Sequence, residues 1–467
     1  MDQKIPAAAA APRENKMGVL PVGKLLFTMA VPMMISMLFQ ALYNVVDSVF
    51  VAMLSQDAMN AVSLAFPLQS LMIALGGGTG VGMNALLSRS LGEKNQAAAD
   101  RAANTGIFLY LCNAVGFCVV GFLLAHPFFL AQTENMAIVN YGSSYVRICL
   151  GLSFGLFTQF CCERLLQSTG RTALSMVTQL TGAITNMILD PILIFGLFGL
   201  PRMEVAGAAL ATVIGQMIAA CVGIVLNVKY NPEIHIRLSH IRWHGITAKE
   251  IYRIGIPSII MQSIGSVMTF CMNQILISFT EAATAVFGAY FKLQSFIFMP
   301  IFGLNNGMVP IVAYNYGAAR PDRVKRTVEL TIAVSVTIMS VGCILFETIP
   351  GILLQAFSPS EEMLAIGKVA LRIIGVHFPL AGFCIIAGSV CQAIGNPLHS
   401  LINSVCRQLV VLLPAAWLLA QTGRLELVWL SFPIAEIMSL VLSTIFLRST
   451  FKHANARMAA AAASATK

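Results

Sequence analysis

The chain has 467 residues, of which 57% are hydrophobic and only 10% are charged. Soluble domains carry about 25% charged residues, so this composition excludes a soluble, disordered, collagen-like or coiled-coil protein and indicates an α-helical membrane protein. The formal net charge of +9 does not imply a nucleic-acid partner, because the basic residues are sorted to one side of the predicted membrane. The 11 cysteines lie in apolar stretches without zinc-site spacing, and we interpret them as small hydrophobic residues.

Twelve runs of mostly apolar residues are long enough to cross a bilayer as helices of about 20 residues. Their predicted limits are 25–54, 61–88, 105–131, 137–163, 172–198, 205–228, 254–280, 284–313, 328–357, 363–393, 397–421 and 426–447. The first run is too long for a cleavable signal peptide, so we expect it to remain as the first helix. Residues 1–20 are predicted to be a disordered cytoplasmic segment, and residues 449–467 a cytoplasmic tail with a disordered Ala-rich end at 456–467.

Lys and Arg residues gather in alternate loops, counted from the N-terminus. The opposite loops hold only Lys368, Arg202 and Arg424. Because positive charges are retained on the cytoplasmic side of a membrane, we predict that both termini are cytoplasmic.

The two halves of the chain repeat each other at a constant spacing of 225 positions. Matched pairs at this spacing are Pro32/Pro257, Gln69/Gln294, Gly82/Gly307, Arg101/Arg326, Arg147/Arg372 and Gly170/Gly395. Each half holds six spans, so both halves enter the membrane in the same direction and are related by a pseudo-two-fold axis along the membrane normal. We predict two six-helix lobes, an N-lobe at 21–228 and a C-lobe at 254–448, joined by a cytoplasmic linker at 229–253.

Two carboxylates stand out within predicted spans, where an ionisable group costs at least about 2.5 kcal/mol and marks a functional site by default. At 1.5 Å per residue, Asp47 lies about 10 Å from the outer end of the first span and Asp190 about 12 Å from that of the fifth. Asn44 and Asn186 stand three and four positions before these acids, so each amide shares a helix face with its carboxylate.

Thr212 in the sixth span and Gln69 in the second lie at a similar predicted depth. Oxygen-rich groups suit Na⁺, and a desolvated carboxylate suits H⁺. We therefore predict a site for one coupling cation, H⁺ or Na⁺, formed by Asp47, Asn186, Asp190 and Thr212.

The second half has lost these polar groups, because the 225 spacing places Met272 opposite Asp47 and Ala415 opposite Asp190. This difference favours a functional site, which is needed only once. In the alternative interpretation, both acids serve only as buried polar groups that hydrogen-bond neighbouring helices.

Other polar residues of the spans are assigned to a supporting polar set or to the substrate cleft: Asn44, Tyr43, Gln69, Gln294 and Glu436. Pro32 is assigned as a hinge, because proline removes a backbone hydrogen bond inside a helix. Lys292, His377 and Arg407 also belong to the second half, and the sequence assigns them no definite role. The chain shows no hydrolase triad, kinase motif or P-loop, which disfavours an enzyme and leaves an ion gradient as the energy source for pumping.

Several motifs, each weak alone, point together to one family. They are Ala30-Val31-Pro32, Asn44-x-x-Asp47, Ser88-Arg89-x-x-Gly92, Asn186-x-x-x-Asp190-Pro191-Ile192, Val205-Ala206-Gly207-Ala208-Ala209 leading to Thr212, and Tyr314-Asn315-Tyr316-Gly317-Ala318. With these motifs the chain resembles the multidrug and toxic compound extrusion (MATE) family, specifically its DinF-like and MepA-like bacterial branch, over about residues 20–450.

The resemblance implies a secondary active transporter of a bacterial plasma membrane that exchanges H⁺ or Na⁺ for small amphipathic, often cationic, drugs and thereby supports antibiotic resistance. It also places the N-lobe cation site of the family on Asp47, Asn186, Asp190 and Thr212. The NorM-like branch has an acidic residue early in the seventh helix, and residues 256–272 contain none, which favours the N-lobe branch. We expect a monomer without a cofactor.

Two alternatives remain at this stage. A lipid-linked saccharide flippase shares the two-lobe design, but such proteins are expected to have a more cationic cavity and often extra spans. A non-transporting membrane receptor or scaffold offers no explanation for acids in one lobe only.

Overall fold

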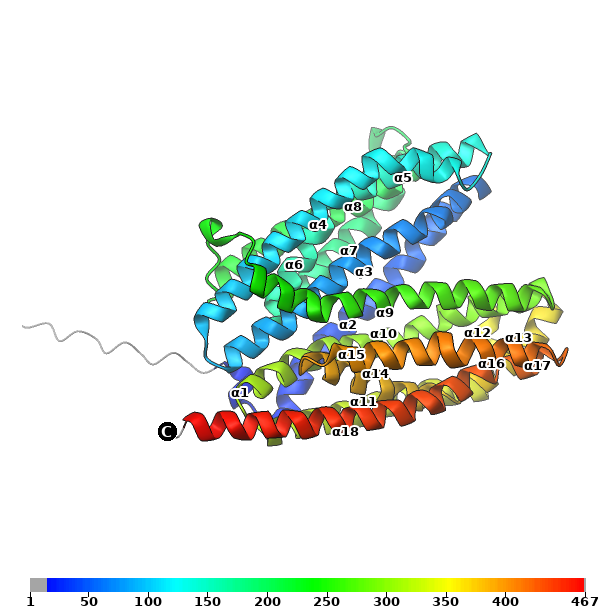
Figure 1. Cartoon of the computed structure of the whole chain (residues 1–467). Helices are drawn as coiled ribbons and strands as arrows, with labels where there is room; N and C mark the ends of the chain where they lie inside the picture. The colour runs from blue at the N-terminus through cyan, green and yellow to red at the C-terminus, as the bar shows by residue number, and fades with distance from the viewer. Residues whose placement is uncertain (1–14, 466–467) are drawn as a thin grey trace, which may run out of the picture.

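The computed structural model describes residues 15–465, which form helices and contain no strand (Figure 1). The first half contains α1 (Lys16–Val19), α2 (Val22–Ala52), α3 (Gln56–Gly92), α4 (Gln96–Leu130), α5 (Met136–Gly151), α6 (Phe154–Ser168), α7 (Thr172–Phe195), η1 (Leu197–Gly199) and α8 (Glu204–Tyr230). After η2 (Leu238–His240), the second half contains α9 (Gly245–Ile277), α10 (Glu281–Gly317), α11 (Pro321–Thr348), α12 (Pro350–Gln355), α13 (Glu361–Gly375), α14 (Phe378–Ala393), α15 (Pro397–Val405), η3 (Cys406–Leu412), α16 (Leu413–Ala420), α17 (Leu425–Val428) and α18 (Ser431–Ala465).

The twelve predicted spans are confirmed, with two of them bent. Ten helices of the described chain are long and apolar enough to cross a membrane, and two further spans are helix pairs. The predicted span 137–163 is α5 and α6, which meet at 44°, and the predicted span 363–393 is α13 and α14, which meet at 48°. Helix α9 begins at Gly245, so the connection between the halves is shorter than the predicted linker at 229–253.

The 225-position repeat reappears in the limits and turns of the helices. Helices α3 and α10 begin and end at matched positions, and their first turns are capped by the matched hydroxyls of Ser55 and Thr280. Gly170 and Gly395 turn the chain after α6 and α14 with φ of +85° and +94°, a region that glycine adopts without strain. The repeated segments therefore fold alike down to single turns.

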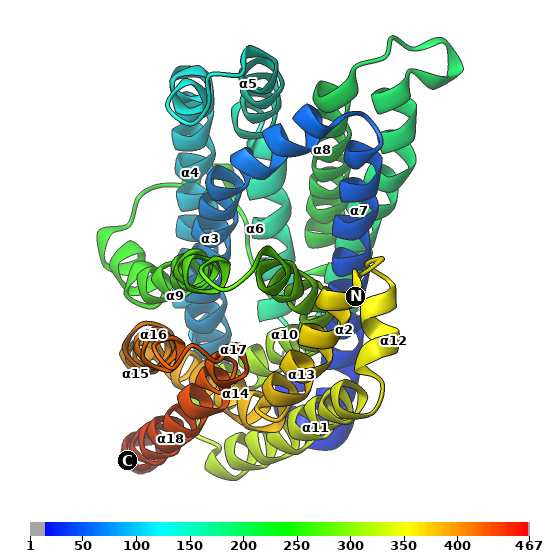
Figure 2. The same ribbon diagram turned by 90° about the vertical axis from the view of Figure 1, so that its right-hand side faces the viewer.

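The two halves form two helical bundles with separate apolar cores. Phe157 and Tyr110 belong to the N-lobe core, whereas Phe287 and Phe378 belong to the C-lobe core. In Figure 1 the bundles meet at the left, where the chain ends, and diverge toward the right. Seen from that right-hand side, α3 to α8 and α9 to α18 form two groups (Figure 2).

The first helix of each half reaches the opposite lobe where the bundles meet. Leu25 and Met29, in the first turns of α2, belong to the C-lobe core. Ile251, in the first turns of α9, packs with Leu109 of α4 in the N-lobe. The two lobes therefore exchange helix ends at this junction.

Matched glycines allow backbone contact at the same junction. A Cβ atom on Gly82 of α3 would lie 2.1 Å from the carbonyl oxygen of Ile251 in α9. A Cβ atom on Gly307 of α10 would lie 2.6 Å from Cα of Ala30 in α2. Both distances are shorter than real Cβ contacts, so the closeness of the lobes here depends on glycine.

Residues 15–20 correct the prediction of a disordered segment at 1–20, of which residues 1–14 lie outside the described chain. Met17 of α1 is fully buried, and its carbonyl oxygen accepts hydrogen bonds from Asn315 and Arg323 of the C-lobe. Asn15 donates its side-chain N–H to the carbonyl oxygen of Thr169 in the N-lobe. Buried apolar area and these hydrogen bonds hold the segment against both lobes. Hydropathy alone did not indicate that this short segment would be ordered.

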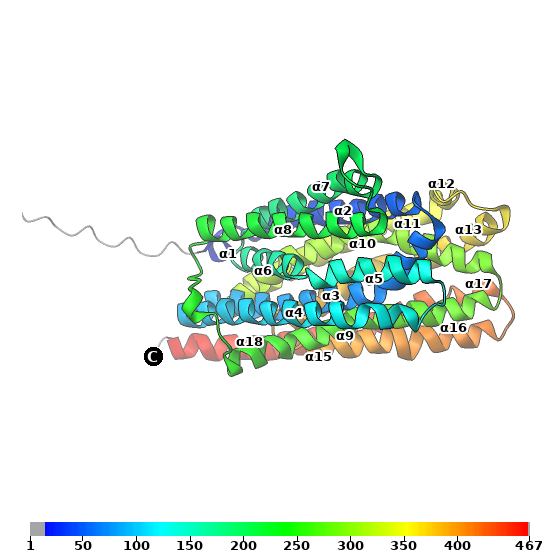
Figure 3. The same cartoon turned by 90° about the horizontal axis from the view of Figure 1, so that it is seen from above.

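The C-terminal end also differs from its predicted disorder at 456–467. Helix α18 continues to Ala465, and residues 466–467 lie outside the described chain. Alanine has the highest helix propensity, and Met458 is buried against the C-lobe core. Figure 3, seen from above, shows this end of α18 on the same side of the molecule as α1.

Candidate functional site

Helices α2, α7 and α8 bring the four predicted cation-site residues together in the N-lobe. Asp47 stands five residues before the end of α2, and Asp190 stands five residues before the end of α7. Asn186 and Asp190 share the buried stripe of α7, as their four-residue spacing predicted. Thr212 of α8 faces this stripe, because α8 packs along α7.

The side-chain amide of Asn186 connects polar groups of two helices, α7 and α8. Its Nδ2 donates to Asp190 Oδ1 at 3.4 Å and to Thr212 Oγ1 at 3.1 Å. The Asp47 carboxyl group lies within interaction range of the Asp190 carboxyl group. Tyr43, one turn before Asp47 on α2, lies close to Thr212 and within electrostatic range of both acids. Tyr43 therefore belongs to the same cluster, as predicted for a supporting residue.

Three oxygens of this cluster are buried and, within residues 15–465, have no hydrogen-bond partner. They are Asp47 Oδ1, Asn186 Oδ1 and Asp190 Oδ2. Leaving polar atoms buried and unpaired is costly, so such groups typically serve a ligand or a proton. No described group of three or more His, Cys, Asp or Glu residues could hold a metal ion. Two acids with amide and hydroxyl oxygens suit one monovalent cation or protons.

The remaining N-lobe candidates divide into one that joins the cluster and one that does not. Gln69 of α3 donates from Nε2 to the hydroxyl oxygen of Tyr145 at 3.0 Å. Tyr145 in turn lies within electrostatic range of Tyr43 and Asp47, so Gln69 is connected to the cluster through it. Asn44 is exposed, and no described side-chain contact connects it to the acids. Sequence reasoning missed Tyr145, because an aromatic residue in an apolar span carries no signal of its own.

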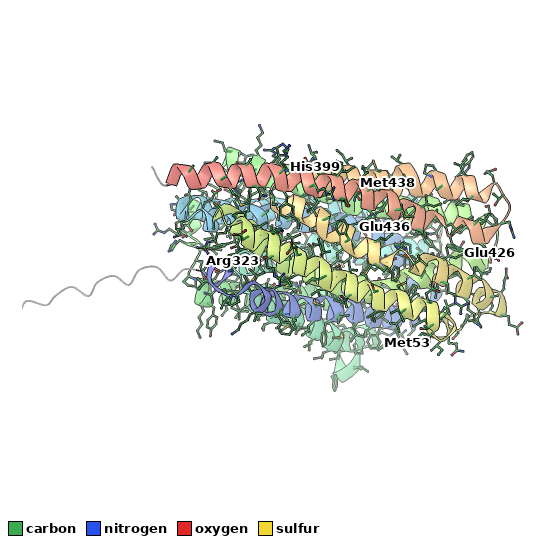
Figure 4. All side chains as sticks on the ribbon, turned by 90° about the horizontal axis from the view of Figure 1, so that it is seen from below. Met53, Arg323, His399, Glu426, Glu436 and Met438 are labelled. Carbon is green, nitrogen blue, oxygen red and sulfur yellow. The ribbon has the colours of Figure 1, made fainter. Side chains whose placement is uncertain are left out.

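The C-lobe candidates lie apart from this cluster. Glu436 of α18, labelled in Figure 4, is buried and accepts a hydrogen bond from Arg407 at 3.1 Å. His377 is buried at the start of α14, and Lys292 lies 5.9 Å from the ring of Phe357. Gln294 of α10, the repeat partner of Gln69, has a buried Oε1 without a partner among the described residues. The structure thus separates a carboxylate cluster from an Arg–Glu pair.

Pro32 lies in the first half of α2, which continues as a helix from Val22 to Ala52. Its neighbours Ala30 and Met34 contact Gly307 and Gly303 of α10. Pro32 is therefore positioned between the junction of the lobes and the Asp47 cluster.

The family model MatE matches two stretches of the chain, residues 32–192 and 257–418. These stretches cover more than half of the chain and begin at the two repeat-related prolines.

Curated relatives match almost the full length of the chain. The "Multidrug export protein MepA" of Staphylococcus haemolyticus (strain JCSC1435) is 27% identical over 416 residues, which cover 88% of this chain and 90% of that protein. A protein of Shewanella oneidensis named "FAD transporter" is 24% identical over 419 residues, which cover 90% of this chain and 92% of that protein.

Solved structures share the fold. One is described as "Outward-facing conformation of a multidrug resistance MATE family transporter of the MOP superfamily", with a TM-score of 0.89 and 24% identity. The match covers 95% of this chain and 98% of that chain. At this identity the match shows a common twelve-helix, two-lobe fold.

Proposed function

The chain belongs to the MATE family of membrane transporters, in its MepA-like branch, and from this premise we propose that it exports amphipathic cationic drugs in exchange for H⁺ or Na⁺. The N-lobe cluster of Asp47, Asn186, Asp190 and Thr212 is the proposed coupling-ion site. The names of the MepA relatives support drugs as substrates.

One observation carries the coupling proposal. Three buried oxygens with no described hydrogen-bond partner gather on two acids and an amide of the N-lobe. A proton or a Na⁺ ion bound there neutralises charge that is otherwise costly to bury. Because such binding is favourable and reversible, the cluster is suited to take up an ion on one side of the membrane and release it on the other.

Helix α2 supports alternating access as the mechanism. It carries Asp47 near one end and contacts Gly307 of α10 through Ala30 at the junction of the lobes. Pro32 lies between these points and removes one backbone hydrogen bond. Ion binding at Asp47 that alters the packing of α2 is therefore transmitted to the junction and favours one of two lobe arrangements.

We further propose a bacterial plasma-membrane location with both termini cytoplasmic, which makes the junction of the lobes the cytoplasmic side. The basic residues Arg89, Arg171 and Arg320 at this end of the molecule support that orientation. The proposed lobes are residues 21–228 and 254–448, in a monomer.

The test is dye export from proteoliposomes under an imposed pH or Na⁺ gradient, with the wild type beside Asp47→Asn. We expect one gradient to drive export by the wild type, and Asp47→Asn to lose that response. The matched control is Glu134→Gln, which neutralises an exposed acid between α4 and α5 and should export normally.

Export by Asp47→Asn with unchanged ion dependence would rule out the proposed site. If neither gradient drives export by folded wild-type protein, a lipid-linked saccharide flippase becomes the better-supported function. The relatives named above do not favour that alternative.

A further inference from the structure

A cavity of about 420 Å³ lies at the junction of the lobes, where α3 ends and α4 and α9 begin. We call it the junction cavity. Helices α3 and α4 belong to the N-lobe and α9 belongs to the C-lobe, so both lobes contribute to its lining. Its charged side chains are Arg89, Glu93, Arg101 and Glu250. The proposed coupling-ion site uses none of them.

Two of these four charges are paired and two are not. Arg89 donates from Nε to Glu93 Oε1 at 2.8 Å. Within residues 15–465, Arg101 and Glu250 have no side-chain hydrogen bond or ion pair. The acid next to Arg101 in the sequence, Asp100, is already hydrogen-bonded to the loop that follows α8. The junction cavity therefore offers one available cation from the N-lobe and one available anion from the C-lobe.

The mouth of the junction cavity has the character of a membrane interface. Ile246, which lines the cavity, is 73% exposed, and Trp243 just before α9 is 59% exposed. Exposed tryptophan beside charged residues is typical of the level of lipid headgroups, where the ring meets hydrocarbon and its N–H meets water. An exposed isoleucine at the same level is suited to contact with an acyl chain. The chemistry of the mouth therefore favours a membrane lipid over a water-soluble ligand.

The repeat-related space of the C-lobe is filled by the protein itself. At the 225 spacing, Ser90 of the junction cavity corresponds to Asn315. Asn315 donates to the carbonyl oxygen of Met17 in α1, and Met17 is fully buried. The repeat position of Met17 in the second half is Arg242, which is exposed. The segment before α9 therefore does not fill the junction cavity as α1 fills its counterpart.

We propose that the junction cavity binds the headgroup of a phospholipid that carries both a phosphate and a primary ammonium group, as phosphatidylethanolamine does. The phosphate accepts hydrogen bonds from the guanidinium of Arg101, and the ammonium group donates to the carboxylate of Glu250. A headgroup bound to both side chains connects the lobes at this end and favours the arrangement in which they are closed here. This site goes beyond the proposed export function and does not depend on it.

A general attraction between basic residues and a negatively charged membrane makes a different prediction. It favours lipids with a net negative charge, and it gives the carboxylate of Glu250 no part in binding. The two explanations are therefore separated by lipids that share the phosphate and differ in the ammonium group.

The experiment measures lipid binding to the purified full-length protein in detergent by native mass spectrometry. The probes are phosphatidylethanolamine and phosphatidylglycerol with the same acyl chains, because the second lipid has hydroxyl groups in place of the ammonium group. The variants are Arg101→Gln and Glu250→Gln, both at exposed positions where the change leaves folding intact. Arg326→Gln is the matched control, because it removes the exposed repeat equivalent of Arg101. Free phosphoethanolamine is added in a separate competition.

We expect the wild type to bind phosphatidylethanolamine about three- to fivefold more tightly than phosphatidylglycerol, since partly exposed ion pairs are weak. Arg101→Gln should weaken the binding of both lipids. Glu250→Gln should weaken the binding of phosphatidylethanolamine alone and abolish the preference, and Arg326→Gln should bind as the wild type does.

Equal or tighter binding of phosphatidylglycerol by the wild type would overturn the proposal, and so would unchanged binding of phosphatidylethanolamine by Glu250→Gln. Displacement of the lipid by an equal concentration of free phosphoethanolamine would also overturn it, because the ligand would then be a soluble compound. No transport is measured, so the result is independent of the coupling test on Asp47.

Discussion

The two lobes are built on one backbone plan and carry different chemistry. Helices α3 and α10 share their limits, and the bent pairs α5–α6 and α13–α14 break at corresponding points. Yet the N-lobe holds Asp47 and Asp190 where the C-lobe holds Met272 and Ala415. Duplication has thus preserved helix limits, caps and glycine contacts, while a few polar residues have made each lobe distinct.

The comparison is sharpest between α7 and its equivalent, the span of α15, η3 and α16. Both begin at matched positions, Thr172 and Pro397, and each contains 24 residues. The first is a regular helix with Asp190 on its buried stripe, and the second has a π-helical segment with Arg407. Two repeat-related spans can therefore have the same length and the same end positions although one carries an acidic residue and the other a basic residue.

The largest effect is expected from moving an acid to the wrong lobe. Met272→Asp puts a carboxylate at the position equivalent to Asp47, where the side chain is fully buried among apolar residues. Without a partner, a buried charge costs several kcal/mol, so we expect at least about 3 kcal/mol of destabilisation and loss of monodisperse protein. Thermal unfolding in detergent measures it. The reverse change, Asp47→Met, should leave the melting temperature nearly unchanged or higher.

The second prediction concerns whether ion coupling depends on Asp190 itself or equally on the equivalent position of the C-lobe. Asp190→Asn should slow ion-driven dye export by at least about tenfold, since losing about 1.4 kcal/mol of ion binding is a tenfold change. Ala415→Asn makes the same amide at the equivalent C-lobe position and should have little effect. Initial export rates in proteoliposomes give both numbers. Similar losses in the two variants would show that the lobes share the coupling function.

A third prediction tests the symmetry of the junction. Gly82→Ala and Gly307→Ala each force a Cβ into the backbone of the facing helix, at an overpacking cost of about 1–3 kcal/mol. We expect both variants to shift the protein toward arrangements in which the lobes separate here. Distances between spin labels on the two lobes report the shift. Gly116→Ala is the control, because no atom lies within 4 Å of its Cβ position.

The smallest effect concerns two matched glutamines. Gln69 donates a hydrogen bond to Tyr145, which lies within electrostatic range of Asp47, whereas the repeat position of Tyr145 in the C-lobe is Ala370. Gln69→Ala should therefore weaken coupling-ion affinity by a few-fold, corresponding to a hydrogen bond of about 0.5–1.5 kcal/mol. Gln294→Ala should leave it unchanged. Ion titration of export rate distinguishes the two, and equal effects would remove the functional difference between them.

Much of the fold could be predicted, because membrane spans appear as runs of apolar residues and the repeat appears as matched residues at a constant spacing. Each span needs its own run of apolar residues, and the duplication was visible in pairs such as Pro32 and Pro257. The bends were not predicted, because apolar residues continue on both sides of Leu152 and Val376, although Pro379 directly follows the second bend. Hydropathy predicts which segments cross the membrane, but it does not predict where the axis of a membrane helix bends.

The candidate site was predicted in part for a similar reason. Asn186 and Asp190 are four residues apart on one helix, so local geometry alone brings them together. Asn44 stands three residues from Asp47 and was expected to share its face, yet it lies on the exposed edge of α2. Arg407 and Glu436 come from different helices, and only tertiary packing pairs them. Contacts between helices depend on rotation about each axis, which one sequence does not define.

The short helix α1 has a consequence for following the protein at work. It is bonded to Arg323 of the C-lobe and, through Asn15, to Thr169 of the N-lobe. A cycle that parts the lobes at this end must break one of these attachments each time. Deuterium uptake by the backbone amides of residues 17–20 should therefore report each opening of the lobes at this end. The uptake rate should rise with the rate of transport, and uptake should stop when the transporter is held closed.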